Sequence, residues 1–383
     1  MRSMLPFYTS VLLWGFCSGL LIPVFPLYIR SLGFSINDWG TLLIVYAVST
    51  FIFEWFWGVL SDITDRRLFI SIGLMSGALF IYLFTQRSLL PFFFILQFLR
   101  GASFIMVGPA AKAMVFDMNS SQGIGFSMGM YTAVRSLGGI LGPVLGSYIV
   151  FFYGYEEALY VYSLFSLIGA IVVFIVKINR EREPIPKIAS TRLLRDWKLL
   201  FSTRSIVTLF TLAIILFFVS SSINSYLPIY AQEVVGMSML EIGALFSVGS
   251  IAGLFSTPLF GWVSDKFGRS RTILSLFLLS TVFLISFIFA KSLIQYALVI
   301  VLFMCFFTPL TPIALAMLTE VTPHRLMGAS IGLYSTFENL GMILSPFICD
   351  IAWSYIPRAI FAAAALIQAT GILLIYFSRK VFK

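Results

Sequence analysis

The stretch Gly58-Val59-Leu60-Ser61-Asp62 decides the fold of this chain, because it recurs 203 residues later as Gly261-Trp262-Val263-Ser264-Asp265. The same offset relates further pairs of residues, namely Arg66 and Arg269, Asp117 and Glu320, Gly125 and Gly328, Tyr131 and Tyr334, Gly138 and Gly341, and Pro143 and Pro346. One ungapped shift therefore maps most of the first half onto the second. The chain contains two copies of one unit.

Composition predicts that both copies lie in a membrane. Apolar residues make up 60% of the 383 residues and charged residues only 11%, whereas about 25% are charged in an ordinary soluble domain. A helix needs about 20 apolar residues to cross a bilayer. We predict twelve such spans, at about residues 5–29, 38–60, 68–86, 91–117, 123–152, 157–178, 204–231, 240–262, 271–290, 292–319, 326–353 and 357–378. The expected fold is an all-α membrane protein with two pseudo-twofold-related bundles of six helices.

The expected organisation is an N-terminal bundle at 1–178, a cytoplasmic linker at 179–203 and a C-terminal bundle at 204–383. The linker opens with the charge run Arg180-Glu181-Arg182-Glu183, and its second part has the pattern of an amphipathic helix at the membrane surface. With the N-terminus in the cytoplasm, most basic residues fall on the inner side, which is the usual bias. We therefore expect a multi-pass protein of the inner or plasma membrane with both termini cytoplasmic. The net charge of +9 then belongs to a face near anionic lipid and requires no nucleic-acid partner.

Six plus six helices joined by a basic linker resemble the major facilitator superfamily, and the resemblance covers essentially the whole chain. The family pattern Gly-x-x-x-Asp-Arg-x-Gly-Arg-Lys/Arg matches the second copy at Gly261, Asp265, Lys266, Gly268, Arg269 and Arg271. The first copy keeps Gly58, Asp62, Arg66 and Arg67. It departs at Ile63, where a basic residue is usual, and at Asp65, where glycine is usual.

The resemblance implies that this motif forms a latch that holds the cytoplasmic side shut. A glycine permits close approach of two helices, and a carboxylate at the end of a span favours a cation or a helix N-terminus as its partner. The expected latch residues are Gly58, Asp62, Arg66, Arg67 and Asp117 in the first half, and Gly261, Asp265, Gly268, Arg269 and Glu320 in the second. The alternative is that these are solvated loop charges.

The fifth span contains a second motif, Gly138-x-x-x-Gly142-Pro143-x-x-Gly146. The spacing of four places the glycines on one helix face, which suits tight packing in lipid, and the proline can bend the helix. The element resembles the one that marks exporters and antiporters within the superfamily. Span 11 has a weaker echo, with Ser345 in place of the middle glycine. Generic helix packing is the alternative.

Four charged residues lie deep in predicted spans: Glu54, Arg100, Arg135 and Glu338, with Lys112 a shallower fifth. A charge near the bilayer centre costs at least ~2.5–3.5 kcal/mol and therefore marks a partner or a functional site. Arg135 and Glu338 occupy the same repeat position with opposite charge. We take Glu338, Glu54 and Arg135 as the proton-coupling candidates, because burial favours the neutral form of a carboxyl group. A structural ion pair is the alternative.

The resemblance assigns the substrate cavity to spans 1, 4, 7 and 10. The substrate-cavity candidates there are Arg100, Trp14, Asn224, Tyr226, Thr308 and Thr311, with Ser18 beside them. In similar exporters the arginine of span 4 stands one turn earlier, where this chain has Gln97. The function of Arg100 could be to bind an anionic group of the substrate or to set the protonation of a nearby carboxylate. The alternative is that Arg100 forms an ion pair with a purely structural role.

The residues predict no catalytic chemistry. The chain has no phosphate-binding glycine loop followed by Lys-Ser/Thr, no cluster of Cys, His or carboxylates with metal-ligand spacing, and no cofactor motif. An intramembrane enzyme, a receptor or a scaffold is disfavoured, because paired repeats are the architecture of alternating access. We expect a monomeric secondary transporter that exports a small amphipathic molecule or drug, with protons as the coupling ion. The alternative is an uptake symporter or uniporter for a sugar or other small metabolite.

Overall fold

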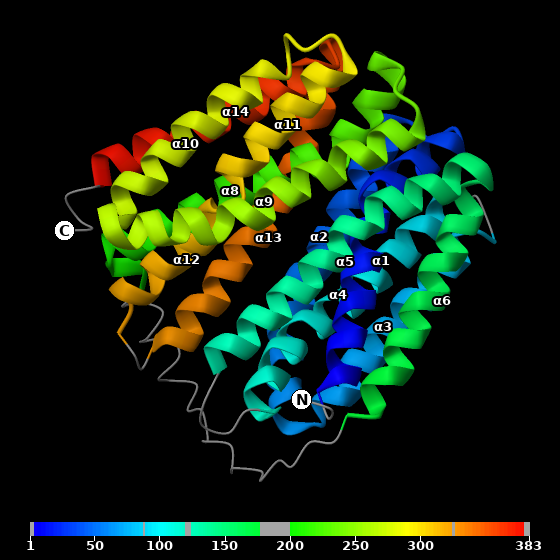
Figure 1. The fold of residues 1–383 in the computed structure, drawn as a ribbon, viewed down its shortest axis with the longest axis horizontal. Coiled ribbons are helices and arrows are strands. Elements are labelled where there is room, and N and C mark those ends of the chain that lie inside the picture. The colour runs from blue at the N-terminus through cyan, green and yellow to red at the C-terminus, as the bar shows by residue number, and fades with distance from the viewer. Residues whose placement is uncertain (1–3, 87–88, 119–123, 177–199, 324–325, 379–383) are drawn as a thin grey trace. The chain divides into compact units, whose positions relative to one another are not determined.

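The structure is a computed structural model that describes residues 4–86, 89–118, 124–176, 200–323 and 326–378 (Figure 1). Most of the predicted linker at 179–203, including its predicted amphipathic helix, lies outside these residues. Nearly all of the described chain is helical. The helices of the first half are α1 (Leu5–Ser31), α2 (Ile36–Ile63), α3 (Arg66–Phe84), α4 (Leu90–Met118), α5 (Ile124–Phe152) and α6 (Tyr155–Phe174).

The second half repeats this pattern of long helices. Its elements are α8 (Arg204–Tyr230), the π-helical turn η1 (Ala231–Val235), α9 (Met239–Phe267), α10 (Arg269–Ser286), α11 (Leu293–Phe307), α12 (Leu310–Val321), α13 (Met327–Tyr355) and α14 (Ala359–Ser378). Each predicted span coincides with one of these elements or, in one case, with two. The prediction of an all-α fold of membrane-spanning helices is confirmed.

Local sequence signals set several helix starts. Ser35 caps α2 and forms a capping box with Asp38, and Ser292 forms the same box with Gln295 at the start of α11. The reciprocal hydrogen bonds of such a box satisfy backbone N–H groups that have no partner within the helix. These starts fix where the chain enters the apolar layer.

The predicted tenth span, 292–319, is broken into α11 and α12. Thr308 and Pro309 form the turn between the two helices, Thr308 as the C-cap of α11 and Pro309 as the N-cap of α12. The helix breaks here because a proline lacks the N–H that would continue it and its ring crowds the preceding turn. The two pieces together still form a candidate span, Leu293–Val321. The break places Thr308, a substrate-cavity candidate, at the end of a helix.

Eleven segments of the described chain are long and apolar enough to cross a membrane. The helix α13, which contains the predicted eleventh span, is not among them. It is 29 residues long, so length does not exclude it. Its polar residues, which include Glu338, Asn339 and Asp350, lower its hydropathy below that of the other spans.

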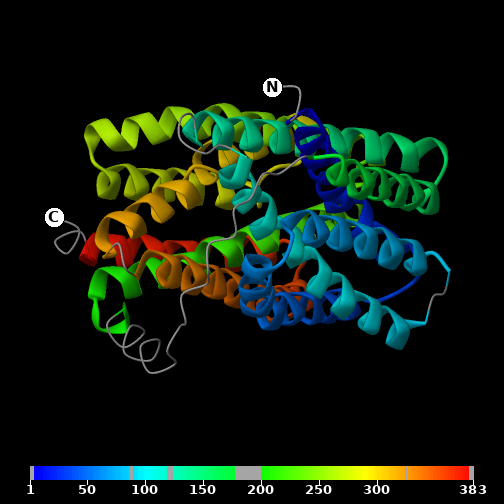
Figure 2. The ribbon, with the colours of Figure 1, turned by 90° about the horizontal axis from the view of Figure 1, so that it is seen from below.

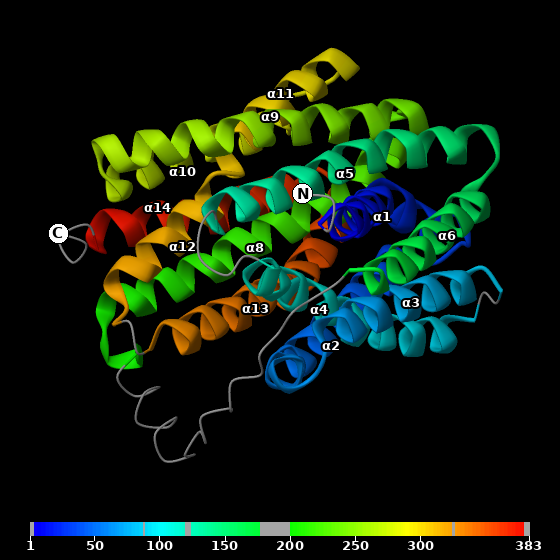
Figure 3. The same cartoon turned by 60° about the horizontal axis from the view of Figure 1, so that its bottom comes forward.

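The helices gather into two compact units, one comprising Met1–Ile185 and Gly236–Ser247, the other Pro186–Val235 and Val248–Lys383. In the first unit α1 packs on α5 and α6, while α4 packs on α2 and α3; Figure 3 shows α1 beside α5 and α6. In the second unit α8 packs on α13 and α14, and the orange ribbon of α13 runs beside the green α8 (Figure 2). We call these the N-terminal and C-terminal units.

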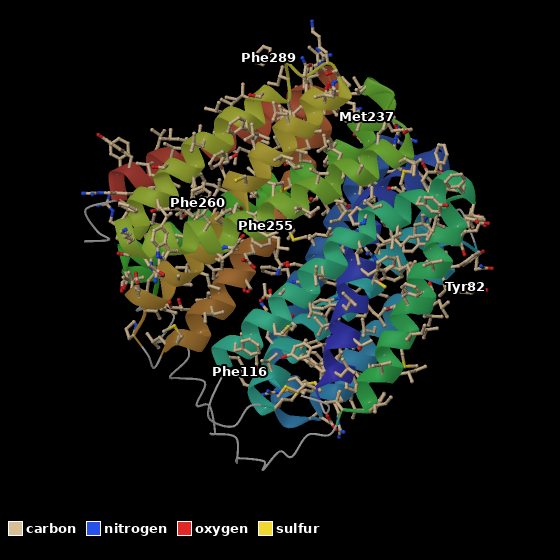
Figure 4. All side chains as sticks on the ribbon, in the orientation of Figure 1. Tyr82, Phe116, Met237, Phe255, Phe260 and Phe289 are labelled. Carbon is tan, nitrogen blue, oxygen red and sulfur yellow. The ribbon has the colours of Figure 1, made fainter. Side chains whose placement is uncertain are left out.

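Large apolar side chains also cover the outer surface of the helices. Phe255 of α9 is 72% exposed, and Phe289, which follows α10, is 71% exposed; both project from the ribbon (Figure 4). A soluble monomer rarely exposes apolar surface so extensively. This surface therefore fits a lipid environment.

Candidate functional site

The conserved offset of 203 residues places an ion pair at the same point in both units. Arg66, the first residue of α3, lies 2.8 Å from Asp117 in the last turn of α4 (Nη1 to Oδ2). Arg269, the first residue of α10, lies 3.1 Å from Glu320 in the last turn of α12 (Nε to Oε1). Both pairs join the start of one helix to the end of another. These charges are therefore engaged with each other rather than only with water.

In the C-terminal unit the aspartate of the motif, Asp265, extends the ion pair of Arg269 and Glu320 to a group of three charges. Asp265 accepts from Arg269 at 3.3 Å, so Arg269 bridges two carboxylates. Gly58 and the side chain of Asp62 lie outside the part of α2 for which the structure describes burial and contacts. No described atom lies within 4 Å of the point where a Cβ on Gly261 would stand, so the close helix approach expected at this glycine is absent there. A latch role for these residues remains a prediction.

The first copy departs from the family motif at Asp65, and the backbone explains the difference. Gly268 has φ +94°, a conformation that favours glycine. Asp65, at the same repeat position, has φ −73° and caps α3 by accepting from the Arg67 backbone N–H at 2.9 Å. Arg67 also donates from its side chain to Asp65 and, at 2.9 Å, to the Val176 carbonyl. Arg67 thus fixes its own helix start rather than pairing with Asp117.

The glycines of the α5 motif pack against α1. A Cβ on Gly138 or Gly142 would overlap the α1 backbone near Phe16, and one on Gly146 would stand 2.7 Å from Leu20. Two glycines of α1 face α5 in return. A Cβ on Gly19 would stand 2.7 Å from the Gly139 carbonyl oxygen, and one on Gly15 would overlap Arg135, also at its carbonyl oxygen. The small-residue spacing Gly15-x-x-x-Gly19 is visible in the sequence and would have predicted this partner surface.

The C-terminal unit builds the equivalent contact differently. Gly341 of α13 approaches the backbone of Phe218 on α8, as Gly138 approaches α1. Ser345, which replaces the middle glycine of the motif, forms a 3.0 Å hydrogen bond between its Oγ and that of Ser222. The Cys349 thiol also donates to Ser222 at 3.2 Å. A hydrogen bond therefore replaces close backbone contact at this point.

Both intramembrane arginines lie against aromatic rings. The guanidinium of Arg135 is 4.4 Å from the centre of the Trp14 ring. The guanidinium of Arg100 is 4.5 Å from the Tyr46 ring and 4.9 Å from the Phe25 ring, and its Nε donates to Gln97 Oε1 at 2.9 Å. Such contacts are worth about 2 kcal/mol or more when desolvated. They offset part of the cost of a buried cation.

The acidic candidates are half-buried. Glu338 lies on α13 one turn after the buried Tyr334, just as Arg135 follows the buried Tyr131 on α5. Glu54 lies on α2 and is likewise half-buried, whereas Lys112 on α4 is exposed. The two units therefore present a tyrosine followed by a charge at one repeat position, and the sign of that charge is inverted.

The polar candidates for the substrate cavity differ in how their polar atoms are used. Trp14 is 6% exposed and lies under Arg135. The Asn224 amide donates to Ser220 at 3.2 Å, and Ser18 donates to the Trp14 carbonyl within α1. Thr308 and Thr311 are half-buried at the break between α11 and α12. Their roles as substrate ligands remain predictions.

Tyr226 is paired with a carboxylate that the sequence reasoning missed. It is fully buried, and its hydroxyl donates to Asp350 of α13 at 2.6 Å. Asp350 lies near the C-terminal end of α13, which is why a search for charges at mid-membrane passes over it. The sequence feature that could have identified Asp350 is its position as an acidic residue in an apolar run, between Cys349 and Ile351. The Tyr226 hydroxyl is thus engaged in joining α8 to α13.

Comparison with a family model finds a match to the Major Facilitator Superfamily over residues 7–346. Among curated proteins, Multidrug resistance protein 2 of Bacillus subtilis is 27% identical over 94% of this chain and 92% of that protein. Quinolone resistance protein NorA of Staphylococcus aureus is 25% identical over 97% of this chain and 95% of that protein. Multidrug resistance protein MdtG of Salmonella arizonae is 25% identical over 95% and 92%.

Solved structures share the fold at low sequence identity. A bacterial homologue of the human lysosomal transporter Spinster, in an inward-facing and unoccupied conformation, superposes with a TM-score of 0.78 at 13% identity, over 100% of this chain and 95% of that chain. The nucleoside transporter NupG gives a TM-score of 0.80 at 12% identity over 100% of both chains. At this identity the likeness concerns the fold alone.

Proposed function

The chain belongs to the major facilitator superfamily, and we propose that it exports a small amphipathic molecule from the cytoplasm in exchange for protons. As a member of this family it is a multi-pass membrane transporter of small molecules and not an enzyme. Relatives that match it over more than nine-tenths of its length are named for drug resistance. Those names support export as the direction of transport.

The observation that carries the proposal is the contact between α5 and α1. The glycines of the exporter-like element lie on the face of α5 that meets α1, and α1 answers with Gly15 and Gly19. Pro143 stands within this contact. In lipid, helices associate through packing rather than hydrophobicity, so the element sets how closely these two helices approach. Its resemblance to the element of exporters and antiporters is the reason we favour antiport.

We propose Glu338 as the first candidate for the residue that binds the coupling proton. It is a carboxyl group on a membrane helix, where an ionisable side chain is costly and marks a functional site. Its repeat counterpart is Arg135, so the C-terminal unit has a titratable acid where the N-terminal unit has a fixed cation. Glu54 and Arg135 are the further coupling candidates. A group that binds a proton and then releases it supplies what an antiporter requires.

The remaining elements of the proposal concern the two faces of the membrane. We place both termini and the two ion-pair networks, Arg66–Asp117 and Asp265–Arg269–Glu320, on the cytoplasmic side of the cell membrane. There they act as a latch during alternating access. We also propose that the transporter works as a monomer, because a single chain supplies both copies of the repeated unit.

Reconstituted vesicles test the direction and the coupling together. The purified protein is placed in liposomes, a pH gradient is imposed, and the movement of permanently charged fluorescent dyes is followed, with ethidium as the cation and a naphthalene sulfonate as the anion. Permanent charges prevent passive trapping by the gradient, and protein-free liposomes are the control. Antiport predicts that a dye accumulates in vesicles with an acidic lumen.

Other outcomes would replace the proposal. Accumulation in vesicles with an alkaline lumen would indicate proton symport, and therefore uptake. Dye movement at the same rate with and without a pH gradient would indicate a uniporter. In either case the export proposal fails, while membership of the family stands.

A further inference from the structure

Two arginines within the apolar part of the N-terminal unit are joined by three aromatic rings. The guanidinium of Arg135 on α5 lies 4.4 Å from the ring of Trp14 on α1, and that of Arg100 on α4 lies 4.5 Å from the ring of Tyr46 on α2. Phe104 of α4 links the two, with ring centres 6.1 Å from Trp14 and 6.0 Å from Tyr46. We call Trp14, Phe104 and Tyr46 the aromatic ladder.

The positive charge on this ladder is not balanced by a carboxylate among the described residues. The ion pairs described in this unit join Arg66 to Asp117 and Arg67 to Asp65. Arg100 and Arg135 contact rings and one amide oxygen instead. Ring contacts offset only part of the free-energy cost of placing each arginine within the membrane. An anion would supply the remaining stabilisation.

Buried hydrogen-bond donors surround the same ladder. Trp14 Nε1, Gln97 Nε2 and the Tyr131 hydroxyl have no hydrogen-bond partner among the described atoms. These residues are 6%, 0% and 3% exposed. Because Gln97 Oε1 accepts from Arg100, the amide is oriented with its NH₂ group left to donate. A buried donor without an acceptor destabilises the folded protein, so the site favours a ligand with acceptor oxygens.

The fold itself does not require this arrangement, because the second copy lacks it. The residues 203 positions after Trp14, Tyr46, Gln97, Arg100 and Phe104 are Phe217, Gly249, Ile300, Phe303 and Phe307. The counterpart of Arg135 is the acidic Glu338. A unit of the same topology therefore folds without the two cations and without the donors of Trp14 and Gln97. Tyr131 alone has an equivalent donor, Tyr334, whose buried hydroxyl also has no hydrogen-bond partner among the described atoms. The arrangement is specific to the N-terminal unit.

We propose that the aromatic ladder and its two arginines bind an aromatic anion, namely a ring system that carries a carboxylate. A carboxylate matches the planar fork of a guanidinium, and it pairs with Arg135 where Trp14 and Tyr131 donate. The ring system stacks on the ladder, and Arg100 with Gln97 receives a second acceptor group. This inference rests on the proposed function, since it names the class of molecule that the transporter carries.

Binding of matched ligands tests the site without any transport. The purified protein in detergent is titrated by calorimetry with 2-naphthoate and with 2-naphthylmethylammonium, which share a ring system and differ in the sign of their charge. We expect naphthoate to bind at least tenfold more tightly. Arg135→Met should lower naphthoate affinity at least tenfold, and Arg135→Lys should restore part of it. Arg204→Gln, which removes an exposed arginine of the C-terminal unit, is the control and should leave the affinity unchanged.

Opposite results would overturn the site. Equal affinity for the two ligands would do so, as would an Arg135→Met variant that melts at the wild-type temperature and still binds naphthoate normally. If Arg135→Met fails to fold, Arg100→Gln and Trp14→Phe serve as the second pair, each expected to weaken naphthoate binding several-fold. Gradient-driven dye movement without naphthoate binding would reject the anion site and leave the export proposal intact. Naphthoate binding without gradient-driven dye movement would support the anion site and reject the export proposal.

Discussion

Glu338 and Arg135 show how one side chain can give two similar units different chemistry. They share a repeat position, and each follows a buried tyrosine by one turn. Arg135 is basic and Glu338 is acidic, so the two units differ in the kind of charged group that they carry at this position. This asymmetry is why we propose that the exchanged proton binds in the C-terminal unit.

We expect Glu338→Gln to abolish transport driven by a pH gradient while leaving substrate binding within about threefold of wild type, because the amide keeps the shape but cannot titrate. Dye accumulation in acidic-lumen vesicles and calorimetric binding measure the two effects. Glu157→Gln, the same change at an exposed position of α6, should transport normally. Wild-type coupling in Glu338→Gln would move the proton to another residue.

The buried pair Tyr226–Asp350 should contribute to stability. Tyr226→Phe removes a charge-assisted hydrogen bond of 2.6 Å, and such bonds between membrane helices are worth about 0.6–1.7 kcal/mol. We expect Tyr226→Phe and Asp350→Asn each to lower the unfolding free energy, and the double variant to lose less than the sum. A double-mutant cycle of thermal unfolding measures this coupling. Strict additivity would show that the hydrogen bond contributes nothing.

At the scale of elements, the α1–α5 contact depends on glycines at particular positions. Gly142→Ala places a Cβ against the backbone of Phe16 and Leu20, whereas Gly139→Ala meets nothing within 4 Å. We expect the first change to lower the melting temperature and transport strongly, and the second to leave both near wild type. Equal effects of the two substitutions would mean that general helix propensity, rather than this contact, matters.

The helices could be predicted from sequence almost completely, because each needs only a long apolar run. Pro309 could have indicated the break between α11 and α12. However, Pro143 and Pro346 lie inside helices that continue past them. A proline alone therefore does not reveal where a membrane helix ends, since neighbouring helices decide it.

Partners were harder to predict than elements. The charge pairs Arg66–Asp117 and Arg269–Glu320 followed from the repeat, because two copies of one pattern imply a shared contact. The Tyr226–Asp350 hydrogen bond and the ring contacts of Arg100 could not be predicted from the repeat. They depend on the rotation of each helix and on its depth in the membrane, which one sequence does not specify. Arg67 was assigned to the latch network, yet its charge is used by Asp65.

For the whole molecule, the repeat offers a matched comparison of the two ion pairs. The side chains of Arg66 and Asp117 are 11% and 15% exposed, whereas those of Arg269 and Glu320 are 24% and 58% exposed. We expect Asp117→Asn to cost about 3 kcal/mol of stability and Glu320→Gln to cost less than about 1 kcal/mol. Thermal unfolding of both variants measures this, and equal costs would contradict it.

The low hydropathy of α13 has a consequence for how the protein is made. A segment that carries Glu338, Asn339 and Asp350 partitions poorly from the translocon into lipid by itself. Asp350 and Ser345 form hydrogen bonds with α8, which is synthesised earlier, and α13 also packs on α14, which is synthesised later. We therefore expect insertion of α13 into the membrane to depend on its contacts with α8 and α14.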